Sequence, residues 1–113
     1  MTDSQAQTDT KTFSITINGA ILGVTSPNGG ETWTIGSTHA ITWTTSGFVG
    51  PFVRIELSRD GGLTWTIIIS TAVNNGSVNW KVTGGATTNA LIKITSWSYP
   101  MVYDISDAVF TIS

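Results

Sequence analysis

The 113-residue chain contains no cysteine and a single histidine, His39. Without thiols it can form no disulfide, no thiolate zinc or iron–sulfur site and no cysteine nucleophile. One histidine cannot form a histidine pair around a metal, and a Ser-His-Asp triad would depend on His39 alone. We expect His39 to lie at the surface edge of a strand.

Charge is the second scarce property. Only 11% of the residues are charged, whereas an ordinary soluble domain carries about 25%. Five Lys plus Arg stand against seven Asp plus Glu, which gives a formal net charge of −2. Five cations are too few to hold a phosphate backbone by counterion release, so we expect no nucleic-acid partner.

Long apolar runs are missing as well. No stretch approaches the roughly 20 consecutive apolar residues of a membrane span, and the first residues lack the pattern of a secretory signal. We therefore expect no direct membrane insertion. Two interpretations stay open, a cytosolic protein or a piece of a longer secreted chain, and the composition leans towards the second.

What the chain does contain is alternation of apolar and polar residues in almost every segment between turn signals. This pattern predicts an all-β fold, an immunoglobulin-like or fibronectin-III-like sandwich of about seven antiparallel strands formed by residues 21–113. The segment at 31–35 is expected to be a brief extended piece. The expected strands cover residues 21–25, 38–45, 52–58, 63–70, 77–82, 90–97 and 108–112.

Tryptophan is abundant, with five residues in the chain. Trp43, Trp65 and Trp80 fall on the inward-facing positions of expected strands, and each can remove roughly 150–250 Å² from water. We therefore expect these three in the core. Trp33 and Trp97 remain open, because one lies in the brief extended piece and the other has the opposite parity to the core positions of its strand.

Four ordered motifs carry a resemblance to a known family: VTSPNGGETW at 24–33, ITW at 41–43, RIELSRDGGLTW at 54–65 and SDAVFTI at 106–112. From about residue 22 to 113 the chain resembles the Ser/Thr-rich, GPI-anchored-membrane-protein type of domain, related to the yeast cell-wall-synthesis KRE/KNH-like domain. The resemblance implies an extracellular β-sandwich, repeated along microbial surface proteins or secreted enzymes, with no catalytic residues to carry over.

Residues 1–20 look different from the rest. Thr12 to Ile17 alternates, with Phe13 and Ile15 on the same face as Ile17. The segment resembles the closing strand of a cadherin-like or immunoglobulin-like domain that precedes such modules in long surface chains. The alternative is an extra edge strand of the same domain, since an apolar face of this kind needs a cover.

A hairpin motif comprises Ser58, Asp60, Gly62 and Trp65. It fits the Asp-box pattern of sialidase propellers, in which the aspartate accepts backbone N–H bonds within the turn. A propeller would need several copies and a far longer chain. We therefore interpret the motif as a structural turn brace.

The carboxylates considered for acid–base catalysis lie in or beside turns or at solvent-facing strand positions, so we expect no catalytic site. Asp104 and Asp107, with Glu31 across the fold, could hold calcium, but such sites usually gather more oxygen ligands. We therefore predict no metal and no cofactor. The five candidate acids are Glu31, Glu56, Asp60, Asp104 and Asp107.

Trp97, Tyr99 and Tyr103 form the remaining feature, an aromatic segment expected to be a loop. The rings either seal one end of the sandwich or form a ligand-binding surface, since the C–H face of a sugar packs against flat rings. We expect a non-catalytic spacer or interaction module of a larger extracellular or cell-surface protein, with neighbouring domains as its partners. The alternative is a carbohydrate-binding accessory domain of a secreted hydrolase, bound to cell-wall or extracellular polysaccharide.

Overall fold

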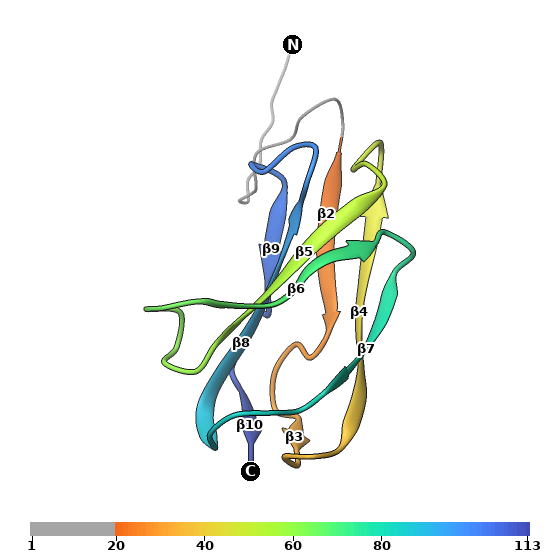
Figure 1. The fold of residues 1–113 in the computed structure, drawn as a ribbon. Helices are drawn as coiled ribbons and strands as arrows, with labels where there is room; N and C mark the ends of the chain where they lie inside the picture. Colours follow the sequence, from red (N-terminus) through yellow and green to blue (C-terminus); the bar gives the residue numbers. More distant parts are fainter. Residues whose placement is uncertain (1–19) are drawn as a thin grey trace.

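The computed structural model describes residues 20–113, and this part of the chain contains strands and no helix (Figure 1). The predicted strand at 12–17, and with it the origin of residues 1–19, lies outside the described residues. Residues 20–113 therefore contain no helix that could span a membrane. The strands are β2 (Ile21–Ser26), β3 (Thr32–Trp33), β4 (Thr38–Ser46), β5 (Phe52–Ser58), β6 (Thr66–Val73), β7 (Ser77–Lys81), β8 (Thr87–Ser96), β9 (Tyr103–Ile105) and β10 (Phe110–Ile112).

The strands form two sheets, which confirms the predicted all-β sandwich. The smaller sheet has the order β2-β4-β7. The larger sheet has the order β3-β10-β8-β5-β6, with β9 also paired to β8. Figure 1 shows β4 and β7 side by side in one layer and β5 beside β8 in the other. The long strand β8 is therefore the centre of the larger sheet, with β5 along one edge and β9 and β10 along the other.

Three departures from the predicted strands change the pairing of the sheets or the position of a site residue. β10 pairs with β3 in parallel, so the sandwich is not purely antiparallel. The segment expected to be a loop ends in a short strand, β9, which pairs antiparallel with β8. β6 begins at Thr66, three residues later than expected, because Leu63 and Thr64 belong to the preceding turn.

The core lies between the sheets and is apolar. Trp43 and Trp80 are buried there, as expected, and Trp33 joins them. The ring of Trp33 stacks on His39 at a centroid distance of 4.6 Å and lies 5.3 Å from the ring of Phe110. His39 lies near the start of β4, is half-buried and covers one face of Trp33.

Trp65 is the exception among the expected core tryptophans. It lies outside any strand, between the turn and the start of β6, and is only partly buried. Its ring is covered by the ammonium group of Lys93, 4.6 Å from the ring centroid. Lys93 alternates with the buried residues Ile92 and Ile94 along β8 and so points to the outer face of the sheet. Trp65 is therefore an outer-face residue, and its assignment to the core was wrong.

Candidate functional site

The structure separates the three aromatic residues of the predicted ligand-binding surface. Trp97 directly follows β8, and Tyr103 begins β9 opposite Thr95, which places both rings on the outer face of the larger sheet. Trp97 is 49% exposed and Tyr103 is 46% exposed. Tyr99 instead packs against the core, with its ring edge-on to Phe48 at 6.1 Å. Trp97 and Tyr103 thus lie on one surface, whereas Tyr99 covers one end of the sandwich.

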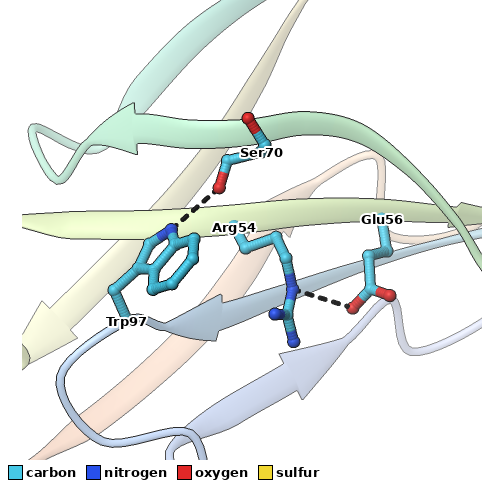
Figure 2. Close-up of polar contacts among 4 residues, drawn as sticks. All are labelled: Arg54, Glu56, Ser70 and Trp97. Atoms are coloured by element: carbon cyan, nitrogen blue, oxygen red, sulfur yellow. Dashed lines mark hydrogen bonds and ion pairs between the residues drawn. The ribbon is translucent and has the colours of Figure 1, made fainter.

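A β-bulge in β6 fixes the ring of Trp97. Val53 pairs with Ala72 and Ile55 pairs with Ile69, so two residues of β6 lie opposite the single residue between them on β5. Such a bulge disrupts the hydrogen-bond ladder locally. The indole Nε1–H of Trp97 donates to the backbone carbonyl of Ser70, in the bulge, at 2.8 Å (Figure 2). The indole is therefore anchored by its only polar atom, although half of its surface remains exposed.

A charged pair lies beside Trp97. The guanidinium carbon of Arg54 is 5.9 Å from the centroid of the Trp97 ring, within the range of a cation–π interaction. Arg54 Nε is 3.5 Å from Glu56 Oε1 (Figure 2). Both residues project from β5 to the outer face, since they alternate with buried Val53 and Ile55. Arg54 is thus held between a carboxylate and an aromatic ring.

Lys93 connects the other two rings of this surface. Its ammonium group lies 4.6 Å from the centroid of Trp65 and 5.8 Å from that of Tyr103. Lys93 pairs with Glu56 across β8 and β5, so the charges on the two strands have opposite signs. We call this surface the outer aromatic face; it comprises Trp65, Trp97 and Tyr103 together with Arg54, Glu56 and Lys93.

The predicted turn brace holds the chain just before Trp65. Ser58 Oγ donates to Asp60 Oδ1 at 2.7 Å and accepts from the Gly62 N–H at 2.8 Å. The Thr64 N–H and hydroxyl both donate to the Asp60 carboxylate, at 2.9 and 2.5 Å. A Cβ built on Gly62 would lie 3.8 Å from the Trp65 ring. These contacts fix the course of the turn that delivers Trp65 to the outer face.

The same hydrogen bonds make Asp60 a strong acid. Donation from the Thr64 hydroxyl and N–H, and then from Ser58, lowers the pKa of Asp60 from 3.8 to about 2. Hydrogen bonds to the charged form of a carboxylate favour that form and so lower its pKa. The folded turn therefore contains an ionised Asp60 under all but strongly acidic conditions.

We expect Asp60→Asn to destabilise the protein above pH 3.8 and to cost progressively less as the pH falls towards about 2. Because the folded-state pKa lies below the unfolded value, the carboxylate's contribution is fully present above the unfolded pKa and is lost as the pH falls through the folded one. Urea unfolding of both proteins across this range measures the difference. A difference that does not vary with pH would contradict the role of the charge.

The SPNGGE segment between β2 and β3 has a structural role. The Glu31 carboxylate accepts hydrogen bonds from the N–H groups of Asn28 and Gly29, at 2.9 and 2.8 Å. The Asn28 side chain in turn accepts from the Asp107 N–H at 2.8 Å and donates to the Asp107 carboxylate at 3.0 Å. The motif therefore joins the β2–β3 connection to the segment that precedes β10.

Asp104 makes a second connection between the sheets. Its Oδ2 atom accepts the Val24 N–H at 2.8 Å, which links β9 in the larger sheet to β2 in the smaller one. Burial raises the pKa of Asp104, and the hydrogen bond from Val24 opposes this shift. The carboxylate thus satisfies a backbone donor on the side of β2 that faces away from β4, at some cost in desolvation.

Each residue considered for calcium makes hydrogen bonds within the protein. Glu31 binds the turn N–H groups, Asp107 binds Asn28 and Asp104 binds Val24. Between residues 20 and 113 the structure brings together no group of three or more His, Asp or Glu side chains that could hold a metal ion.

Comparison with known proteins gives no relative for this chain: no protein-family model, no curated protein and no solved structure matches it.

Proposed function

We propose that the chain is a non-catalytic interaction module of a longer microbial cell-surface or secreted protein, and that the outer aromatic face is its contact surface. The observation that carries the proposal is the position of Trp97. Its ring is half exposed, yet its indole N–H is bonded to Ser70 and Arg54 lies beside it. A large ring held in place and open to solvent is what a binding anchor requires, because little conformational freedom is lost on contact.

A spacer would have no use for such a surface. Apolar side chains on a monomer's surface are normal when they occur singly, whereas a clustered set indicates an interaction site. Here Trp97, Tyr103 and Trp65 share one sheet face, and the polar residues between them are held by mutual contacts. This clustering favours the interaction module over the spacer.

We propose that the chain is not catalytic because its acidic side chains already have partners within the protein. Each of the five carboxylates in the described part of the chain has a partner within the protein, which leaves none free in a cleft to exchange protons with a substrate. General acid–base catalysis needs a carboxyl group within reach of the reacting atom. The location on a longer extracellular chain is proposed from the resemblance to the KRE/KNH-like domain and from the low charge.

Sedimentation with isolated bacterial and fungal cell walls tests the proposed surface. We expect the wild-type chain to sediment with at least one wall preparation and Trp97→Ala to stay in the supernatant. Phe48→Ala is the matched control, because Phe48 is also an exposed aromatic residue but lies at the end of the sandwich. Equal sedimentation of all three proteins, or none by the wild type, would overturn the proposal.

A further inference from the structure

We infer that the outer aromatic face binds an uncharged polysaccharide chain, laid across Trp97, Tyr103 and Trp65. This inference rests on the proposed function, because it names the ligand class of the same surface. Three properties of the face carry it: the length of the aromatic row, the state of its charges and the way polar groups interrupt its apolar area.

The aromatic row is longer than one sugar ring. Trp97 and Lys93 are four residues apart on the same side of β8, which corresponds to about 13 Å along a strand. Tyr103 lies between these positions, opposite Thr95, and the Lys93 ammonium contacts both Tyr103 and Trp65. Trp97 reaches across β5 to Ser70 of β6, whereas Tyr103 lies on β9, on the other side of β8. The rings are therefore spread along and across the sheet, over an area larger than one sugar ring.

The flat rings suit the C–H faces of sugars. One face of a pyranose consists largely of C–H bonds and packs against an aromatic ring, while its hydroxyl groups project from the edge. The charged residues of the face supply both kinds of hydrogen-bonding partner, since Arg54 and Lys93 donate and Glu56 accepts. A hydroxyl can use either kind, because it donates one hydrogen and accepts through two lone pairs.

The state of the charges favours a neutral ligand. Arg54 is paired with Glu56 and lies beside Trp97, and Lys93 is shared between two rings. Two cations and one carboxylate leave a formal charge of +1 on the whole face. An acidic polysaccharide or a nucleic acid would need several cations free to neutralise it. Arg54 and Lys93 are shared with Glu56 and the rings, so they can donate to hydroxyl groups but do not supply the several free cations that an anionic chain requires.

A protein partner fits the face less well. Protein interfaces place a continuous, mostly apolar centre, depleted of charge, inside a polar rim. In the outer aromatic face, charged residues lie between the rings at the centre. Arg54 and Glu56 alternate along β5 beside Lys93 on β8, so charge lies at the centre of the face, and the rings and the exposed side chains of Phe52 and Ile67 lie around it. Separate rings with hydrogen-bonding groups between them match a chain of hydroxylated rings.

The test is binding to purified polysaccharides, followed by tryptophan fluorescence for soluble β-1,3-glucan, mannan and xylan and by sedimentation for cellulose and chitin. We expect the 113-residue protein to bind at least one of them with little dependence on salt, since screening weakens only interactions between charges. Trp97→Ala should weaken binding at least about tenfold, which corresponds to about 1.4 kcal/mol. Alginate serves as the acidic comparison.

Two further variants protect the test against a folding defect. Tyr103→Ala removes a ring for which residues 20–113 provide no anchoring hydrogen bond, and it should also weaken binding. Phe48→Ala should bind as the wild type does. Circular dichroism and thermal unfolding establish that each variant is folded before it is compared.

The outcomes separate the ligand class from the proposed function. Binding to alginate alone, lost at high salt, would overturn the inference. So would Trp97-dependent sedimentation with cell walls together with no binding to any neutral polysaccharide, although the interaction module would then stand. Polysaccharide binding that neither Trp97→Ala nor Tyr103→Ala reduces would overturn the assignment of this face.

Discussion

Replacing Phe110 with alanine is expected to lower the free energy of unfolding by about 3–5 kcal/mol, the range for large aromatic residues in protein cores. Phe110 is 1% exposed, and its ring lies 5.3 Å from the ring of Trp33. Phe110 pairs with Ala90 of β8, and the neighbouring residues of β10 form the parallel pair with β3. A cavity here would loosen the contact between the last strand and the Trp33 cluster.

Val109→Ala is the matched control for this substitution. Val109 precedes Phe110 directly, but its side chain is 40% exposed, so its truncation removes little buried surface. We expect a change within about 0.5 kcal/mol, as for ordinary surface substitutions. Chemical denaturation followed by tryptophan fluorescence measures both variants. Equal losses would show that the cost comes from strand pairing and not from the core.

Gly29→Ala is expected to cost roughly 3–5 kcal/mol, the sum of a backbone and a packing term. Gly29 has a φ of +141°, which side chains of L-residues rarely adopt. A Cβ at this position would lie 2.8 Å from the Cβ of Ala108, closer than two carbon atoms can approach without movement. Ala108 is itself held by a hydrogen bond from its N–H to the Asn28 carbonyl, so the clash falls on a fixed segment.

Gly30→Ala separates the cost of the backbone conformation from the cost of the steric clash. Gly30 also has a positive φ, of +81°, but a Cβ there would meet no atom within 4 Å. We expect only the backbone cost, about 1–2 kcal/mol. Thermal unfolding of the two variants compares them directly. If Gly30→Ala were as destabilising as Gly29→Ala, the close approach to Ala108 would not be the cause.

The sequence predicted those parts of the fold that depend on local alternation. The period of two in 52–58 corresponds to β5 with the same bounds, and the Asp60-Gly61-Gly62 signal lies in the predicted turn. The sequence could not predict how many residues the turn would use. The bonds from Thr64 to Asp60 extend the turn, which moves the start of β6 and takes Trp65 out of the core.

The sequence likewise predicted only part of the candidate site, because local patterns show which residues are aromatic but not which strands bring them together. The sequence singled out Trp97, Tyr99 and Tyr103 as an aromatic segment, but left open whether the rings seal one end of the sandwich or form a binding surface. Their place on one surface depends on β9, a three-residue strand too short to show a period. The anchoring of Trp97 depends on Ser70, 27 residues away in the chain, and on a β-bulge that the local sequence pattern does not predict. Long-range pairing determines these features.

The bulge that presents the Ser70 carbonyl also affects how copies of this protein meet. Among the strands of residues 20–113, β6 ends the larger sheet, and its eight residues include neither a charge nor a proline. An edge strand of this composition is a template for aggregation, and natural proteins use bulges to interrupt such edges. The pairing of β6 with β5 shifts register twice, which bends the strand and disturbs its outer row of backbone groups. The irregularity that holds Trp97 therefore also discourages the sheet from extending into a neighbouring molecule.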